Sequence, residues 1–143
     1  MNEIDTVYEA WEQLKNCSST LKKVDILNSY VKNKDVRNFF FYALNDYNYG
    51  VKSVKNREAA CKECVCSFTD MINLLESMRK REITGNKADE AVEFLLEKCD
   101  EKAKTVFLCM LQKKTRCGVS TKLVDKVWPN MITNQAKVMK ARP

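Results

Sequence analysis

The sequence predicts an all-α fold, and three of its features lead to that prediction. Its 143 residues include only three glycines and two prolines, so residues that break helices are scarce. Leucine, alanine, lysine and glutamate, which favour helices, are abundant. Apolar residues also recur at helical spacing along most of the chain. We therefore expect a compact single-domain bundle of about six or seven helices joined by short loops.

The first 44 residues contain three apolar stripes at helical spacing, each of which predicts one amphipathic helix. The second stripe follows three residues that can cap a helix N-terminus, and Asp35 can cap the third. The aromatic residues of the third stripe most simply belong to the core. The cap candidates before the second stripe are Ser18, Ser19 and Thr20, and the stripes are Ile4, Val7, Tyr8, Trp11 and Leu14; Leu21, Val24, Leu27 and Val31; and Val36, Phe39, Phe40, Ala43 and Leu44.

Four more helices are predicted beyond a loop at about residues 45–57, where Asn, Asp and Gly interrupt the periodicity. The last of them ends at Pro129, which cannot continue a helix. The predicted N-terminal caps are Ser67 or Thr69 for the first of them, Asn86 paired with Asp89 for the second and Ser120 for the last, and the third begins after Asp100. Their apolar faces are Met71, Ile72, Leu75 and Met78; Ala91, Val92, Leu95 and Leu96; Val106, Phe107, Met110 and Leu111; and Leu123, Val124, Val127 and Trp128.

Positive charge gathers at the C-terminal end of the chain. The net charge is +6, and residues 111–143 hold eight basic side chains against one acid, Asp125. The remainder of the chain is nearly neutral. Such a basic end predicts an anionic polymer as partner, most commonly nucleic acid, with an acidic membrane surface as the weaker alternative.

The sequence carries neither a secretory leader nor an apolar run of the roughly 18 residues that span a membrane. We therefore expect a monomer inside the cell with no membrane partner. Seven cysteines form an odd number, and without a secretory context reduced thiols are expected.

The motif CKECVC, with Cys61, Cys64 and Cys66, resembles a zinc-binding motif in its spacing. A structural zinc site needs about four ligands, yet the chain has no histidine and its other cysteines are isolated in the sequence. Buried, small apolar side chains are the simpler interpretation, and no metal site is expected. A zinc-dependent helical module remains as an alternative.

Sequence patterns of catalysis are also absent. Without histidine, Cys117 has no imidazole base to activate it, and triads of the Ser-His-Asp kind are excluded. Carboxylate pairs occur only at helical spacing on presumed polar faces, and no glycine-rich nucleotide loop is present. We expect no catalytic residue in this chain.

Two glycine turns, ITGNKADE and RCGVSTKLVDK, each lead directly into a predicted helix. The start of a helix offers unpaired backbone N–H groups to an anion, and glycine lets the backbone approach it closely. Arg116, Ser120 and Lys122 flank the second turn. Phosphate binding and plain helix capping both fit these turns.

Both turns lie within longer motifs. Residues 67–96 read SFTDMINLLESMRKREITGNKADEAVEFLL, and residues 107–132 read FLCMLQKKTRCGVSTKLVDKVWPNMI. These stretches resemble the N-terminal α-helical DNA-binding domain of phage-type ATP-dependent DNA ligases, with its patterns R-x-L-T-G-N and C-G-V-S followed by K-V-W-P. A loop at residues 49–52 is similar to the family's Y-G-I-K. The resemblance covers roughly residues 36–139; Ile83, Asn130 and Met131 depart from it, and CKECVC is no part of it.

The resemblance implies sequence-independent binding of nicked double-stranded DNA, through its phosphate backbone on the minor-groove side, in DNA replication and repair. It implies a location in the cytoplasm of an infected host cell. The contacts it implies are Thr84, Gly85, Asn86, Lys87, Arg116, Gly118, Val119, Ser120, Thr121 and Lys122, with Gly50 and Lys52 as less certain additions.

The family's adenylation motif K-x-D-G is missing, because the nearest matches, at residues 23–26 and 87–90, lack the glycine. We expect no cofactor in this chain; ATP and Mg²⁺ would serve catalytic domains elsewhere in the parent ligase. Residues 1–132 are expected to form the DNA-binding domain, and residues 133–143 a basic linker toward a nucleotidyltransferase domain. The alternative function is a helical module that docks on a replication factor such as a sliding clamp.

Overall fold

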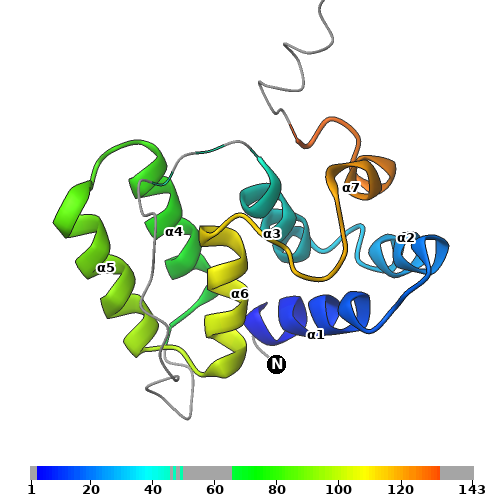
Figure 1. The fold of residues 1–143 in the computed structure, drawn as a ribbon, viewed down its shortest axis with the longest axis horizontal. Coiled ribbons are helices and arrows are strands. Elements are labelled where there is room, and N and C mark those ends of the chain that lie inside the picture. Colours follow the sequence, from blue (N-terminus) through cyan, green and yellow to red (C-terminus); the bar gives the residue numbers. More distant parts are fainter. Residues whose placement is uncertain (1–2, 46, 48, 50–65, 133–143) are drawn as a thin grey trace, which may run out of the picture.

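The computed structural model describes residues 3–45, 47, 49 and 66–132, and within these ranges it contains seven α-helices and no strand. The prediction of a compact all-α fold is confirmed (Figure 1). None of the described helices is both long and apolar enough to cross a lipid bilayer. The helices are α1 (Glu3–Lys15), α2 (Thr20–Ser29), α3 (Lys34–Leu44), α4 (Phe68–Arg79), α5 (Gly85–Glu97), α6 (Glu101–Leu111) and α7 (Thr121–Val127).

The helices form two neighbouring groups along the long axis of the molecule (Figure 1). Helix α1 packs against α6, α3 and α2, and α2 also packs against α7. Helices α4 and α5 form an antiparallel pair at the end of the long axis opposite to α2 and α7, and α6 lies between this pair and α1 (Figure 1). The short helix α7 is therefore held by its contact with α2, far from the α4–α5 pair.

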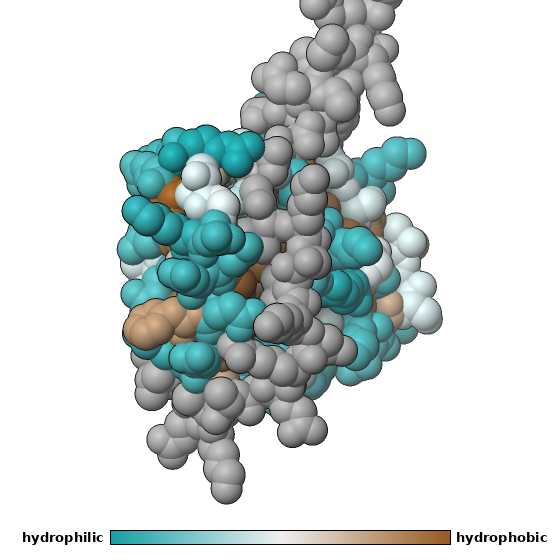
Figure 2. Space-filling view, turned by 60° about the vertical axis from the view of Figure 1, so that its left-hand side comes forward, coloured by the Kyte–Doolittle hydropathy of each residue, from teal (hydrophilic) through white to brown (hydrophobic). Residues whose placement is uncertain are grey.

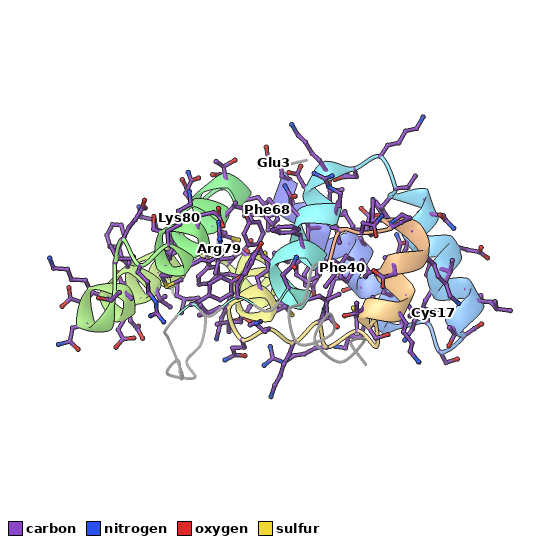
Figure 3. The ribbon with its side chains drawn as sticks, turned by 90° about the horizontal axis from the view of Figure 1, so that it is seen from above. Glu3, Cys17, Phe40, Phe68, Arg79 and Lys80 are labelled. Atoms are coloured by element: carbon purple, nitrogen blue, oxygen red, sulfur yellow. The ribbon has the colours of Figure 1, made fainter. Side chains whose placement is uncertain are left out.

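A single apolar core runs through both groups. The aromatic residues predicted to lie in the core do so, since Phe39 and Phe40 are almost inaccessible to solvent. Phe40 lies on α3 (Figure 3). Its ring is edge-on to that of Phe39, with centroids 5.0 Å apart, and its centroid lies 6.3 Å from that of the Trp128 ring at the end of α7. Burial of these large side chains stabilises the contact between α3 and the residue that ends α7.

The predicted N-terminal caps at Ser67 and Ser19 are confirmed, and Asp100 caps α6 without having been predicted as a cap. Ser67 accepts a hydrogen bond from the Asp70 N–H at 3.0 Å, and the Asp70 carboxylate accepts one from the Ser67 N–H at 3.0 Å, which is a complete capping box. The Asp100 carboxylate accepts a hydrogen bond from the N–H of Ala103 at 2.8 Å at the start of α6. Ser19 caps α2, as one of the three candidates there.

Two other predicted caps are wrong. Asn33, and not Asp35, caps α3, because its side-chain oxygen accepts hydrogen bonds from the N–H groups of Asp35 and Val36. At α5 the N-cap is Thr84, so Asn86 lies inside the first turn of the helix and cannot cap it. In each case the residue that caps the helix is the one with extended backbone angles. The residue type alone does not show which candidate has these angles.

The apolar stripe predicted for α2 is only partly buried. Leu27 is inaccessible, but Leu21 is 77% exposed and Val31, which follows the helix, is 39% exposed. Helix α2 lies at the edge of the bundle and contacts α1 and α7 along one narrow side, so the ends of its stripe point toward solvent.

Both tryptophans donate hydrogen bonds that tie distant segments together. The Trp11 Nε1–H donates to the Thr115 carbonyl at 2.7 Å in the core, and the Trp128 Nε1–H donates to the Val31 carbonyl at 2.9 Å. The first bond fixes the segment between α6 and α7 on α1, and the second fixes the end of α7 next to α2.

Replacing Trp11 by Phe removes the buried donor and leaves the Thr115 carbonyl with only the weak Cys109 thiol as partner. We expect a loss of about 1–3 kcal/mol in the free energy of unfolding. Trp128→Phe, whose hydrogen bond is only partly buried, serves as the comparison and should cost less. Urea unfolding followed by circular dichroism measures both; an equal or larger loss in Trp128→Phe would contradict the dominant role of the Trp11 bond.

Candidate nucleic-acid interface

The first glycine turn begins where α4 ends. The Arg81 N–H donates to the Met78 carbonyl at 3.1 Å and the Glu82 N–H donates to the Ser77 carbonyl at 2.9 Å, which is the Schellman pattern that closes a helix. The pattern requires a left-handed residue, normally glycine, and here it is Arg81, with φ +62°. An exposed guanidinium group is therefore held at the tip of the α4–α5 pair at a backbone position that disfavours it.

Residues 84–87 of this turn are all exposed. Thr84 makes no side-chain cap hydrogen bond, so its hydroxyl is not occupied by capping α5. Gly85 has φ +56°, and a Cβ atom there would meet nothing within 4 Å. Its backbone angle, and not a lack of space, favours glycine. The face formed by α4 and α5 is mainly hydrophilic (Figure 2).

The second glycine turn lies in the segment of residues 112–120, which is held by side chains from α1 and α2 and by one side chain of its own. The Thr115 carbonyl accepts the Trp11 hydrogen bond, and the buried Thr115 hydroxyl donates to the Val119 carbonyl at 2.9 Å. The Lys23 ammonium group on α2 donates to the Gly118 carbonyl at 3.3 Å. The backbone of this segment is thus fixed before any ligand arrives.

Three residues of this segment have left-handed backbone angles, Lys113 with φ +58°, Arg116 with φ +57° and Gly118 with φ +73°. A Cβ atom on Gly118 would lie 2.2 Å from the Lys23 Nζ, and the positive φ would strain any side chain there in addition. Arg116 is exposed, and its guanidinium donates to the Gln112 side-chain oxygen. The backbone angle at position 118 therefore favours glycine, and a larger residue there would also displace the Lys23 ammonium group from the turn.

The remaining predicted contacts of the second turn differ in what they can offer. The side chains of Ser120 and Lys122 are exposed and that of Thr121 is half-buried, whereas Val119 is buried and can contribute only its backbone. Ser120 is the N-cap of α7 but makes no side-chain cap hydrogen bond. Helix α7 has only seven residues, so its dipole is small. The positive charge at this turn therefore comes mainly from side chains.

The described basic side chains near this turn are not equivalent. The Lys113 Nζ donates to the Tyr47 carbonyl at 2.7 Å and is partly buried, so its charge serves the fold. The side chains of Lys114 and Lys126 are exposed, as are those of Arg116 and Lys122. These four exposed basic side chains lie in the segment of residues 112–120 and in α7.

The structure places the two turns apart. The α4–α5 turn lies at one end of the long axis, and α7 lies in the other half of the molecule (Figure 1). Each turn could therefore contact a separate stretch of an extended ligand. Gly50 and Lys52 fall outside the described residues.

Sequence reasoning missed two basic residues at these turns. Lys23 reaches Gly118 from 95 positions away in the sequence, and no local pattern could predict that contact. Arg81 precedes the first turn, but the left-handed conformation that sets its direction is visible only in the structure.

Cys117 is a packing residue beside the second turn. Its side chain is only 3% exposed, and burial raises the pKa of its thiol to about 11. Burial also raises the pKa of the neighbouring Cys109 thiol. Because the thiolate is the nucleophile, a thiol that stays protonated at neutral pH is inert.

Comparisons with known proteins relate the fold to ligases. The sequence matches no protein-family model and none of the curated proteins. Among solved structures, the chain is similar to Pmar-Lig_PreS3, with a TM-score of 0.79 and 26% identity over 88% of this chain and 31% of that chain. It is also similar to Pmar-Lig_Pre, with a TM-score of 0.77 and 26% identity over 85% of this chain and 29% of that chain.

The fold is that of a ligase-related domain. The chain spans less than a third of the length of these solved ligase chains.

The raised pKa of Cys117 predicts a pH dependence of stability. The folded state favours the protonated thiol, so the thiol stabilises the fold fully below its ordinary pKa of 9.0. This stabilisation is lost as the pH rises toward about 11. The free energy of unfolding of the parent should fall by roughly 2–3 kcal/mol between pH 9 and 11 through this thiol, and Cys117→Ala should lack that fall. Urea unfolding across this range measures it, with Cys17→Ala, at a half-exposed site, as control. A constant stability difference between parent and Cys117→Ala would refute the assignment.

Proposed function

We propose that this chain is a non-catalytic, sequence-independent DNA-binding domain of an ATP-dependent DNA ligase. In this proposal it grips nicked double-stranded DNA through the phosphate backbone, on the minor-groove side. The observation that carries the proposal is the structural similarity to ligase chains over 88% of this chain. The sequence motifs around both glycine turns support the same assignment.

The separation of the two turns suits a long ligand. A duplex presents phosphates at regular intervals, so one domain can contact its backbone at two places without reading any base. Each turn offers exposed backbone, a glycine with positive φ and a nearby arginine, Arg81 at the first and Arg116 at the second. A ligase must act on any sequence, and contacts of this kind carry little sequence information.

The electrostatics of the second turn favour an anion. Carbonyl oxygens repel phosphate, and the Gly118 carbonyl is occupied by the Lys23 ammonium group. The exposed Arg116 and Lys122 add positive charge on the same turn. Phosphate neutralisation by such side chains releases counterions, which makes binding depend strongly on salt.

Ligation itself belongs to other domains in this proposal. The chain has no K-x-D-G lysine to accept an adenylate, no histidine, and a protonated thiol at Cys117. ATP and Mg²⁺ would bind to the catalytic domains of the parent ligase. The role of this chain would be to hold the duplex while those domains close around the nick.

The combined substitution Arg116→Ala with Lys122→Ala should weaken binding to a nicked duplex by at least about tenfold at low salt. It should also reduce the dependence of log affinity on log salt by about 0.9 for each phosphate that the variant no longer neutralises. Fluorescence anisotropy at several salt concentrations measures both quantities, and circular dichroism verifies the fold.

The matched control is Lys98→Ala with Lys102→Ala, which removes the same charge from the junction of α5 and α6, away from both turns. This control should retain most of the affinity. Equal weakening in both double variants would indicate a diffuse charge effect, and salt-insensitive or absent binding by the parent would instead favour docking on a protein such as a sliding clamp.

Arg81→Gly should change stability and DNA binding in opposite directions. Glycine relieves the left-handed strain, so the free energy of unfolding should stay constant or rise by up to about 1 kcal/mol. Loss of the guanidinium group should weaken duplex binding several-fold. Asn130→Gly is the control, because Asn130 also has a positive φ, of +65°, but carries no charge; it should leave affinity unchanged. Unchanged affinity in Arg81→Gly would exclude Arg81 from the interface.

A further inference from the structure

Tyr47 contacts both of the segments that carry the glycine turns. The Arg79 guanidinium group, at the last residue of α4, lies over the Tyr47 ring, 4.6 Å from its centroid. Lys113, which directly follows the C-cap of α6, donates through Nζ to the Tyr47 carbonyl at 2.7 Å. Arg79 lies two residues before Arg81 of the first turn, and Lys113 lies three residues before Arg116 of the second. These two contacts form a bridge between the segments, the Tyr47 bridge.

Both partners of Tyr47 are themselves held in place. The Arg79 guanidinium group is fixed by its two-point ion pair with Glu76, at 2.7 and 2.9 Å, and a planar group held in this way still offers a face to an aromatic ring. Lys113 has a left-handed backbone, with φ +58°, and its N–H donates to the Met110 carbonyl at 3.2 Å in the turn that closes α6. The bridge therefore connects α4 and the end of α6 through groups that have little freedom of their own.

Tyr47 is also attached to the end of α3. Its N–H donates to the carbonyl of the buried Asn45 at 2.9 Å, and its ring lies edge-on to that of Phe41, with centroids 5.8 Å apart. Helix α3 packs against α1 and α6 in the middle of the molecule (Figure 1). The Tyr47 bridge is thus anchored on the centre of the bundle.

We propose that Tyr47 is a positioning residue that holds the two glycine turns at the separation needed to contact one duplex together. The proposal rests on the proposed binding of DNA by both turns. A duplex presents its phosphates at fixed intervals, so the separation of the two turns must match them. Two contacts held on one rigid body bind a common ligand more tightly than two contacts that move relative to each other, because the second contact then costs less entropy. Tyr47 itself contacts no phosphate in this arrangement.

The bridge contacts the α4–α5 pair near its tip. Arg79 is the last residue of α4, next to the Arg81 turn, whereas the pair rejoins the bundle at its opposite end. A rotation of the pair about that end displaces the tip most, so a contact near the tip restrains the rotation most. Loss of the Tyr47 ring should therefore widen the range of separations between the two turns.

The first test measures this separation without DNA. The full chain carries spin labels on unnatural amino acids at the exposed positions Glu82 and Lys126, which leaves the native cysteines unchanged. Double electron–electron resonance then gives the distribution of the distance between the labels. Tyr47→Leu should broaden this distribution, whereas Tyr47→Phe, which keeps the ring, should match the parent. An unchanged width in Tyr47→Leu would overturn the proposal.

The substitution Lys113→Met tests the bridge from its other side. It removes the ammonium donor to the Tyr47 carbonyl and leaves the ring over which Arg79 lies. This variant should also broaden the distance distribution, and it decides the matter where Tyr47→Leu fails to fold. A distribution as narrow as that of the parent would count against the bridge.

The second test measures affinity for hairpin duplexes of increasing length, from about 6 to about 20 base pairs, or about 20 to 70 Å. The parent should bind at least about tenfold more tightly once the duplex is long enough to reach both turns. Tyr47→Leu should retain the affinity of the parent for the short duplexes and bind the long ones at least about threefold more weakly. Tyr47→Phe should behave like the parent at every length.

The matched control is Phe94→Leu. It removes another ring that lies under a cation, the Lys98 ammonium group 4.2 Å from the centroid, but Phe94 is 60% exposed near the end of α5 that is remote from the Arg81 turn. This variant should leave both the distance distribution and the dependence of affinity on length unchanged.

The outcomes separate this proposal from the proposed function. A stepwise rise of affinity with length in the parent that persists in full in Tyr47→Leu would overturn the role of Tyr47 alone. A loss of affinity that is equal at every length would indicate a general disturbance of the fold and would also overturn it. A parent whose affinity shows no such step would contradict contact by both turns, and the proposed two-turn binding would fail together with the role of Tyr47.

Discussion

The hydrogen bond from the Trp11 indole to the Thr115 carbonyl is the constraint on which the C-terminal part of the fold depends. It joins α1 to an irregular segment 104 residues later, at 2.7 Å and inside the core. A buried carbonyl without a partner is costly, so this segment is stable only where such donors exist. The buried Thr115 hydroxyl, the partly buried Trp128 indole and the exposed Lys23 ammonium group donate further hydrogen bonds around the same segment and α7.

Basic side chains in this molecule divide between those that hold the fold and those that face solvent. Arg79 forms a two-point ion pair with Glu76, at 2.7 and 2.9 Å, and this pairing holds the pKa of the Glu76 carboxyl below its ordinary value. Its guanidinium also lies over the ring of Tyr47, 4.6 Å from the centroid. Arg81, two residues later, is exposed on a left-handed backbone. Net charge alone therefore overstates the charge available to a partner.

Helix positions could be predicted from the sequence because burial of one helix face leaves a periodic pattern, and all seven helices were found where the pattern predicted them. Caps were predicted less well, since Asn33 and Thr84 rather than Asp35 and Asn86 have the required backbone angles. Long-range contacts left no local signal: neither the approach of Lys23 to Gly118 nor that of Cys99 to Cys66 follows from the sequence.

The α4–α5 pair is the element in which fold and proposed function meet. At one end its backbone turns through Arg81 and Gly85, both with positive φ, so the turn has one well-defined shape that displays the guanidinium group. At the other end the two helices rejoin the bundle beside Cys66 and Cys99. Because α4 and α5 are each several turns long, a small rotation of the pair at its base would move the Arg81 turn by a larger distance. The packing at the base of the pair therefore sets where, in the proposed function, the first turn meets a phosphate relative to the second.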